Sequence, residues 1–273
     1  MGDKWKKQWN VFFNKQIVGT AAERFELELH SLQKLGSFEN YIYEGSKNGE
    51  AYILRLVHSS HRSKEQIASE LDWLNYLRTC GANVCGAFLS ENSSFIESIP
   101  AEETFFHASL FEKAKGSAVS MDDPAFNPTL FEAWGRTIGQ FHQLTKNYKR
   151  PAHIEPRPDL VQSFEQQLLP FVPMNDKALY HNVKHLFEQV QKIPKTANRY
   201  QLIHSDLHRG NFHYDNGNIY AFDFDDCSHH HIVHDLAMPL YYSVWLKYDS
   251  IEQRNEFAAH FFAAVSAWIS ERA

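Results

Sequence analysis

Short runs of mainly apolar residues, separated by polar turns, mark the first part of the chain and predict strands. Residues 40–45 and 51–57 predict two strands, joined by a Ser-Lys-Asn-Gly turn at residues 46–49. Residues 63–79 repeat apolar side chains at three- and four-residue spacing, which predicts a helix. The other elements predicted here are a helix followed by a strand within residues 20–36 and short strands near residues 86–90, 94–98 and 105–111.

Helical periodicity dominates after Gly116. Residues 129–147 predict a long amphipathic helix, and a second helical stretch at residues 159–193 is interrupted by Pro170 and Pro173. The remaining predicted elements are short apolar strands at residues 200–204 and 218–224 and helices near residues 234–247 and 251–271.

The change from strand-rich to helix-rich sequence predicts an α+β fold with two lobes. The N lobe, an antiparallel sheet plus a helix, is predicted at residues 1–111. The C lobe, mainly helical, is predicted at residues 112–273, and the hinge at about residues 110–116. Ligands favour clefts between lobes, so we expect binding residues from both.

Composition narrows the classes of function. The 273 residues carry a net charge of -6, which argues against a nucleic-acid binder with a broad basic surface and gives no support to binding an anionic membrane. No apolar run approaches the roughly 18 residues of a membrane span, and no signal peptide is evident. Three cysteines do not form a disulfide framework, so we expect a reducing cytoplasm.

The strongest chemical signal is the segment His-Ser-Asp-Leu-His-Arg-Gly-Asn at residues 204–211. Its spacing, H-x-D-x-x-x-x-N, is that of the catalytic loop of kinases. Asp206 is suited to accept the proton of a substrate hydroxyl and to orient its oxygen for in-line attack. Asn211 offers a neutral oxygen to Mg²⁺, which prefers oxygen ligands.

A second acidic residue follows at the distance that the kinase pattern requires. Asp223 comes twelve residues after Asn211, at the end of the apolar run Ile-Tyr-Ala-Phe. On an extended strand it shares a face with Ile219 and Ala221, where a carboxylate is costly unless a cation such as Mg²⁺ meets it. The alternative is that Asp206 and Asn211 cap a turn and that Asp223 begins the next one.

An independent pair of charges occurs in the first part of the chain. Arg55 lies on the strand face of Ile53 and Val57, and Glu70 interrupts the apolar stripe of the helix that follows. A buried carboxylate needs a partner, and Arg55 is the nearest candidate. A kinase needs such a cation on the nucleotide phosphates, held by a helix carboxylate. The alternative is a solvated Arg55 at a sheet edge and Glu70 on a helix shoulder.

The motifs HSDLHRGN, AFDFDD and HDLA (residues 234–237) together resemble the aminoglycoside phosphotransferase and choline kinase superfamily, over about residues 25–245. The resemblance implies a protein-kinase-like fold in which the N lobe binds the nucleotide and the C lobe carries catalysis and the acceptor. It implies that Asp206 is the catalytic base, that Asn211 and Asp223 bind Mg²⁺, and that Arg55, held by Glu70, binds phosphate.

Other roles follow from the resemblance alone. Residues 110–114, with Glu112 and Ala114, correspond to the hinge that hydrogen-bonds adenine through its backbone, and Asp235 corresponds to a structural acid behind the catalytic loop. No G-x-G-x-x-G loop is present; in its place Ser37 and Asn40 are candidates to contact phosphate through side chain and backbone.

The expected function is transfer of the ATP γ-phosphate to a hydroxyl of a small molecule, with homoserine-, choline- or sugar-like acceptors open. One alternative is a protein serine/threonine kinase of the same fold, because residues 37–40 resemble a bacterial stress kinase. Another is a nucleotide-binding module without turnover, which the missing glycines suggest. The sequence does not indicate the oligomeric state.

Overall fold

The computed structural model describes residues 13–37, 39–167, 169–247, 250–252, 254–255, 258–259 and 261–263. Contacts within the chain divide it into two compact units. Unit 1 contains the residues up to Lys115 together with Arg150–Pro156, and unit 2 contains Gly116–Lys149 and the residues from Arg157 onward. The segment at 150–156 therefore returns to unit 1 between two stretches of unit 2.

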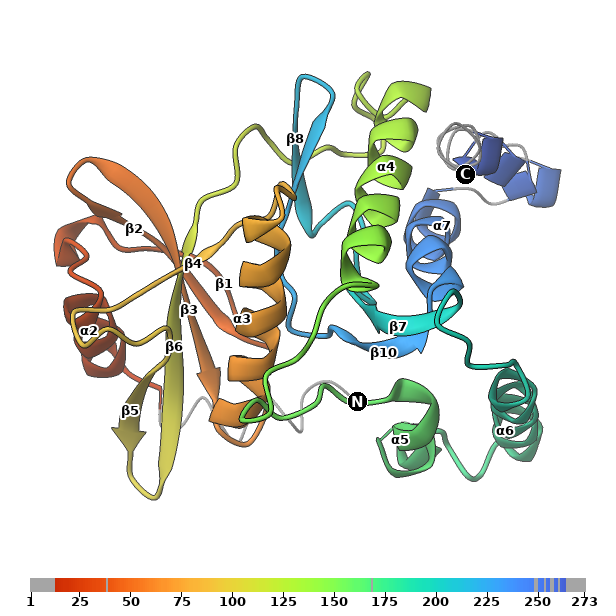
Figure 1. Ribbon diagram of the computed structural model, residues 1–273, viewed down its shortest axis with the longest axis horizontal. Helices are drawn as coiled ribbons and strands as arrows, with labels where there is room; N and C mark the ends of the chain where they lie inside the picture. Colours follow the sequence, from red (N-terminus) through yellow and green to blue (C-terminus); the bar gives the residue numbers. More distant parts are fainter. Residues whose placement is uncertain are drawn as a thin grey trace. The chain divides into compact units, whose positions relative to one another are not determined.

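Unit 1 is built on an antiparallel sheet of strand order β1-β2-β3-β6-β4, with β5 also paired to β6 (Figure 1). β6 pairs with β3 along one edge and with β5 and then β4 along the other. The turn between β2 and β3 places Asn48 and Gly49 at positive φ, as a tight hairpin requires. The strands are β1 (Gln33–Ser37), β2 (Tyr41–Lys47), β3 (Glu50–His58), β4 (Ala87–Phe88), β5 (Glu97–Ala101) and β6 (Thr104–Glu112).

The two faces of this sheet are covered by different helices. Leu54 and Leu56 of β3 share a core cluster with α2 (Lys15–Arg24), which contributes Ala21 and Ala22. The alternate residues of β3 point to the other face, where Arg55 meets α3 (Lys64–Thr79). Figure 1 shows α2 and α3 on opposite sides of the strands. Because successive residues of a strand point to opposite faces, Leu54 and Leu56 pack toward α2 and Arg55 contacts α3.

Helix α3 begins where the sequence predicts. Ser63 is its N-cap and forms a capping box with Gln66, so two backbone donors of the first turn are satisfied reciprocally. A 3-10 turn, Leu29–Ser31, lies between α2 and β1.

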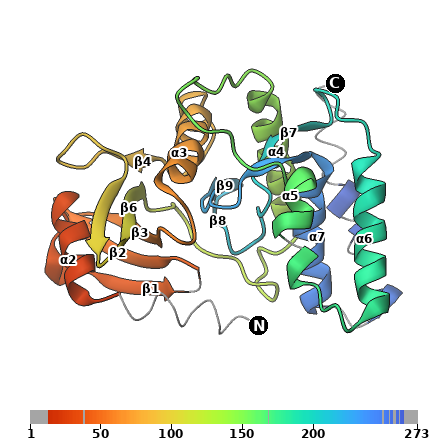
Figure 2. The same ribbon diagram turned by 90° about the horizontal axis from the view of Figure 1, so that it is seen from below.

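Unit 2 is mainly helical and contains two small two-stranded sheets (Figure 2). α4 is buried along one face, with Leu130, Trp134, Ile138 and Phe141 at helical spacing, and it contacts β7, β9 and α7. The helices are α4 (Pro128–Thr145), α5 (Leu160–Gln167), α6 (Lys177–Gln191) and α7 (Val233–Lys247), with a 3-10 turn at Leu169–Phe171. Helical residues also occur among the described positions between 251 and 263.

The small sheets carry the loops that matter below. β7 (Tyr200–Ile203) pairs with β10 (Ser228–His231), and β8 (Phe212–Asp215) pairs with β9 (Asn218–Ala221). The segment at 204–211 connects β7 to β8, and the segment at 222–227 connects β9 to β10. Both candidate chemical loops therefore connect the same two small sheets of unit 2.

Several elements differ from the sequence-based predictions. β8 and β10 were not predicted, because Phe-His-Tyr-Asp and Ser-His-His-His lack a clear apolar alternation. The strand predicted at residues 218–224 ends at Ala221, so Asp223 is not part of it. By contrast, the helical stretch predicted at residues 159–193 is divided at its prolines as predicted, into α5 and α6. No helix within the described ranges is both long and apolar enough to cross a membrane.

Gly116 provides a test of this architecture. Its φ is +78°, and a Cβ added there would lie 2.3 Å from the Tyr214 carbonyl oxygen, where Ser117 bridges to β8. We predict that Gly116→Ala lowers the free energy of unfolding by about 2–5 kcal/mol, from left-handed strain plus a backbone clash.

Gly217→Ala is the matched control, because Gly217 also has positive φ but has open space around its Cβ position. Urea unfolding should show a loss of only about 1–2 kcal/mol for it. Equal losses in the two variants would contradict the clash.

Candidate active site

The loop at residues 204–211 brings Asp206 and Asn211 together. The Asn211 side chain donates from Nδ2 to the Asp206 carbonyl oxygen at 2.9 Å and to carboxylate Oδ2 at 3.0 Å. Asn211 is buried, whereas Asp206 is only half-buried. These contacts fix the carboxylate while leaving part of it accessible. Because Asn211 uses Nδ2 as the donor to Asp206, its Oδ1 is the amide atom left to accept a hydrogen bond or bind a cation.

His204 fixes the beginning of this loop from inside the unit. Its Nδ1 accepts from the Asp206 backbone N–H at 3.3 Å, and its Nε2 lies 3.2 Å from the Phe222 carbonyl oxygen. One nitrogen thus accepts and the other donates, which is the pattern of a neutral imidazole. Burial lowers the pKa of His204, in agreement with that state. His204 therefore ties the loop of Asp206 to the loop of Asp223.

His208 approaches the Asp206 carboxylate from the other side. Its Nδ1 accepts from the Gly210 N–H at 2.9 Å, which leaves Nε2 as the donor, 3.5 Å from Asp206 Oδ2. Its ring packs on Tyr242 of α7 with centroids 4.2 Å apart. Burial lowers the pKa of His208 to about 4, so the ring is neutral near pH 7. His204 and His208 thus both hydrogen-bond to the backbone of this loop.

Asp223 lies in the loop after β9 with φ +61°, and its side chain is exposed. The expectation that it ends a buried strand face beside Ile219 and Ala221 is wrong: the strand stops before it and the backbone turns. The Phe222 N–H donates to the Asn211 carbonyl oxygen at 3.0 Å, so the residues preceding Asp223 run alongside Asn211. An exposed carboxylate does not need a cation to offset the cost of burial. The case for metal binding by Asp223 therefore rests on the backbone contact that brings its neighbour Phe222 alongside Asn211.

Asp235 at the start of α7 lies behind the catalytic loop, as predicted. Its Oδ1 accepts from the Ser205 backbone N–H and its Oδ2 from His142 Nε2, both at 2.8 Å. Burial by itself raises the pKa of this carboxyl, but the hydrogen bond from His142, with that of Ser205, outweighs it and the pKa is lowered. Ser205 has φ +70°, an unfavourable conformation that these contacts maintain.

In unit 1, Arg55 and Glu70 form the predicted pair. Two parallel hydrogen bonds of 2.7 Å join the guanidinium to the carboxylate, and both side chains are buried. The guanidinium also lies over the Phe111 ring, 4.8 Å from its centroid. The alternative of a solvated arginine and glutamate is therefore wrong, while a role of Arg55 on phosphate stays a prediction.

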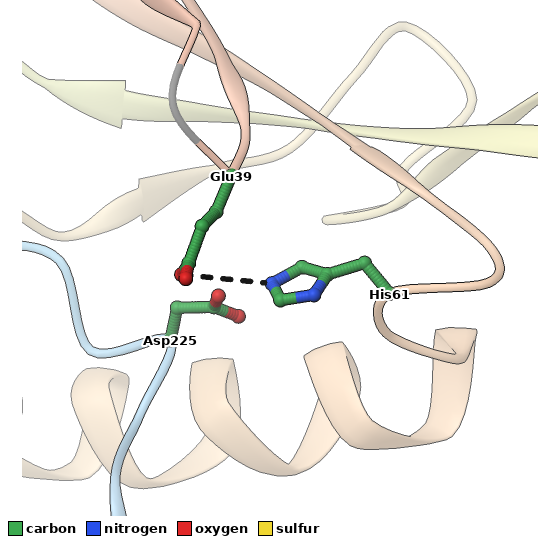
Figure 3. A group of neighbouring side chains, drawn as sticks. All are labelled: Glu39, His61 and Asp225. Carbon is green, nitrogen blue, oxygen red and sulfur yellow. Dashed lines mark ion pairs between the residues drawn. The ribbon is translucent and has the colours of Figure 1, made fainter. Parts of the chain in front are cut away.

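Ser37 and Asn40 bracket the turn between β1 and β2. Ser37 pairs with Tyr41 across the ladder, so Asn40 lies beside the strand end. Glu39 of the same turn approaches His61, which follows β3, with carboxylate and ring nitrogen 4.0 Å apart (Figure 3). This contact links the turn to the start of α3. Phosphate binding by Ser37 and Asn40 stays a prediction.

The predicted hinge residues are anchored within unit 1. The Glu112 N–H donates to the Gly86 carbonyl oxygen at 2.9 Å, and its carboxylate lies 3.2 Å from Arg78 at the end of α3. The next residue, Lys113, pairs with Glu44 of β2 at 2.8 Å. The segment that leads to Ala114 is thereby fixed to a helix and a strand. Adenine contacts by Glu112 and Ala114 stay predictions.

The candidate site residues thus comprise the Asp206 carboxylate held by Asn211, the Asp223 carboxylate, and Arg55 held by Glu70. Kinases use the same residue types. Comparison with known proteins points to the same class of enzyme. The sequence profile of the phosphotransferase enzyme family matches residues 30–272. The chain belongs to this family.

The named relatives of this phosphotransferase are kinases. It is 32% identical to the amicoumacin kinase of Bacillus subtilis over 266 residues, covering 96% of this chain and 79% of the relative. A structure of an amicoumacin kinase in complex with AMP-PNP, Ca²⁺ and Ami has a TM-score of 0.88 at 31% identity, over 96% of this chain and 80% of that one.

A more distant neighbour extends the fold similarity. The structure of a microcompartment-associated aminopropanol kinase has a TM-score of 0.75 at 21% identity, over 93% of this chain and 81% of the other. These matches confirm the predicted fold. They also confirm the prediction of an ATP-dependent phosphotransferase with a small-molecule acceptor at the level of the family and its named kinases.

Two residues that support the catalytic loop of this phosphotransferase were not recognised from the sequence. Trp134 of α4 donates from Nε1 to the Leu207 carbonyl oxygen at 3.0 Å, and His142 meets Asp235. Trp134 lies on the apolar face of α4 and is fully buried, as a core residue would be. Nothing in the local sequence separates an ordinary core tryptophan from one that also donates a hydrogen bond to a loop carbonyl 73 residues later.

The buried Asp235 predicts a dependence of stability on pH. Its pKa is lower in the folded than in the unfolded state, so its contribution is present above the unfolded pKa of about 4 and is lost as the pH falls through the folded pKa. We predict that Asp235→Asn lowers the free energy of unfolding by about 3–5 kcal/mol at pH 7, because the donors of His142 and Ser205 lose their charged hydrogen-bond acceptor.

Urea unfolding between pH 3 and pH 7 checks this prediction. The difference from wild type should shrink toward pH 3, whereas Glu165→Gln, on the exposed face of α5, should match wild type throughout. A difference for Asp235→Asn that does not change with pH would show that the charge is not what stabilises the loop.

Proposed function

We propose that this phosphotransferase transfers the γ-phosphoryl group of ATP to a hydroxyl of a small molecule, with Asp206 as the catalytic base. The observation that carries the proposal is the Asp206 carboxylate held by Asn211 Nδ2 at 3.0 Å in a loop tied down by Ser205, His204 and Trp134. A group fixed in this way is already oriented before the acceptor binds, which is the main requirement of phosphoryl transfer.

The proposed step is an in-line displacement. The acceptor oxygen forms a bond to the γ-phosphorus while the bond to the β,γ-bridging oxygen breaks, and ADP leaves with that electron pair. The hydroxyl proton passes to the Asp206 carboxylate. His208 and Asn211 both approach Oδ2 of Asp206, which supports a fixed orientation of the carboxylate toward the acceptor.

Asn211 and Asp223 fit a Mg²⁺ site. Both offer oxygen atoms, and hydrogen bonding of Asn211 Nδ2 to Asp206 assigns its Oδ1 to the opposite direction. We assign the ion to these two residues; when bound, Mg²⁺ neutralises charge on the phosphates. The Ca²⁺ and AMP-PNP in the related amicoumacin kinase structure support use of a divalent ion with a nucleotide.

Unit 1 supplies the proposed nucleotide residues. Arg55, fixed by Glu70, is assigned to the phosphates, and Ser37 and Asn40 to the same group from the turn after β1. Glu112 and Ala114 are assigned to adenine through their backbone. The rigidity of the Arg55–Glu70 pair supports this role, because a guanidinium held by two hydrogen bonds needs no reorganisation to receive an anion.

Amicoumacin is the first acceptor to test, since a kinase of that compound is 32% identical over 96% of this chain. Amino alcohols, choline, homoserine and sugar-like compounds are the other candidates of the same chemical class. A cytoplasmic location is part of the proposal and is consistent with free thiols at Cys80, Cys85 and Cys227.

Incubation with labelled ATP and a panel of acceptors tests the function. The panel holds amicoumacin, amino alcohols, sugars, aminoglycosides and proteins. We expect label on a small molecule only, and we predict that Asp206→Asn lowers kcat by about 10²–10⁴-fold because the base is lost, while ATP binding is retained.

Asp215→Asn, in the β8–β9 hairpin, is the control and should turn over like wild type. Full activity of Asp206→Asn would refute the assignment of the base. Label on proteins alone would favour a protein kinase, and thermal stabilisation by ATP without any product would favour a binding module.

The Arg55 assignment predicts a separate effect. Arg55→Lys keeps the charge but cannot make two parallel hydrogen bonds to Glu70, so we expect kcat/KM for ATP to fall by about 10–100-fold while KM for the acceptor changes little. Steady-state kinetics with each substrate varied measures both. Lys47→Arg, at an exposed ion pair with Glu26, is the matched control and should leave both values unchanged.

A further inference from the structure

A buried arginine with no assigned role contacts the loop that carries Asp223. Arg157 is 5% exposed, and it is the first residue of unit 2 after the segment Arg150–Pro156 of unit 1. The prolines at 156 and 158 flank it. Proline fixes its own φ and restricts the residue before it to extended conformations, so the backbone that presents this side chain has little freedom.

The guanidinium binds backbone carbonyl groups of the loop between β9 and β10. Nε donates to the Cys227 carbonyl oxygen at 2.7 Å and a terminal nitrogen donates to that of Asp225 at 2.5 Å. These two carbonyls lie in the segment that starts at Asp223. A planar guanidinium with several donors can hold two such oxygens at once, which a lysine ammonium does not do with the same geometry.

The main chain around Arg157 is attached to the far end of the same loop. The His229 N–H donates to the Pro158 carbonyl oxygen at 2.8 Å, and Asp159 forms a parallel bridge with His229. The backbone of this segment therefore continues the β7–β10 sheet, and the Arg157 side chain reaches from it into the loop. Both the origin and the target of the side chain are fixed.

Other contacts complete the constraint on the loop. Phe224 is fully buried against His204 and Phe141, and the Cys227 N–H donates to the Phe224 carbonyl oxygen at 2.9 Å. The loop thus has its aromatic side chain in the core and two carbonyls on Arg157, while Asp223 points to the surface. The buried Phe224 ring and the carbonyls bound by Arg157 therefore restrict the orientation of Asp223.

We propose that Arg157 is a positioning residue for the divalent cation, because its bonds to the carbonyls of residues 225 and 227 fix the loop that presents Asp223. The inference rests on the proposed function, in which Asp223 binds Mg²⁺. The cationic guanidinium also lies next to a loop that contains three aspartates, where it offsets their mutual repulsion.

Direct metal titration tests the proposal. Mn²⁺ is titrated into the full-length protein with AMP-PNP present, and free Mn²⁺ is followed by electron paramagnetic resonance. For Arg157→Met we expect the Kd of Mn²⁺ to rise by about 10–100-fold, the range typical when a group that orients a metal ligand is removed. Arg157→Lys keeps the charge, so the Kd of Mn²⁺ should rise for it too, but by less than for Arg157→Met.

Steady-state kinetics provide a second readout. Raising free Mg²⁺ should restore most of the kcat of Arg157→Met, and KM for the acceptor should stay within about twofold of wild type. Lys195→Met is the matched control, since Lys195 is a cation paired with Asp159 of the same segment and has no assigned part in the site. Its Mn²⁺ affinity should equal that of wild type.

The outcomes separate the inference from the proposed function. Folded Arg157→Met and Arg157→Lys with wild-type Mn²⁺ affinity, alongside weakened binding in Asp223→Asn, would overturn the role of Arg157 and leave the metal site intact. Unchanged binding in Asp223→Asn would overturn the metal assignment and the inference with it. If Arg157→Met does not fold, Arg157→Lys decides: lower Mn²⁺ affinity supports the proposal and wild-type affinity refutes it.

Discussion

The catalytic loop depends on one buried carboxylate. Asp235 accepts from the Ser205 N–H on one oxygen and from His142 on the other, and it lies almost entirely out of solvent. Without this anion, the positive φ of Ser205 would be an uncompensated cost of about 1–3 kcal/mol. The turn at Ser205 immediately precedes Asp206, whose backbone N–H donates to His204 and whose side chain is only half-buried. A buried carboxylate outside the proposed chemistry thus fixes the backbone next to the proposed base.

Each unit contains a buried carboxylate that fixes a group to which we assign a function. In unit 1 the carboxylate of Glu70 holds Arg55; in unit 2 Asp235 holds the backbone next to Asp206. Buried charges are costly to desolvate and contribute little net stability compared with apolar packing. What they contribute here is a defined position, since a bidentate pair or a carboxylate with two donors has one satisfactory geometry. The role of these buried carboxylates is therefore orientation more than net stability.

The sequence predicted the groups that form regular patterns. Arg55 and Glu70 were found because each breaks an apolar period, and the H-x-D-x-x-x-x-N spacing placed Asp206 beside Asn211. The strand expected to run to residue 224 shows the limit of this reasoning, because nothing in the apolar run Ile-Tyr-Ala-Phe marks a backbone that turns at positive φ. His142, Trp134 and Arg157 act through tertiary hydrogen bonds to distant loop atoms, and such contacts leave no periodic trace in a single sequence.

The contacts of the two loops also explain why their functional side chains remain accessible. His204, Trp134 and Arg157 all bind backbone atoms, and Asp235 accepts a backbone N–H. These described contacts are made with the main chain, while Asn211 and His208 approach one oxygen of the Asp206 carboxylate. Fixing the backbone gives the loop rigidity, so the proposed base is already oriented before an acceptor hydroxyl binds.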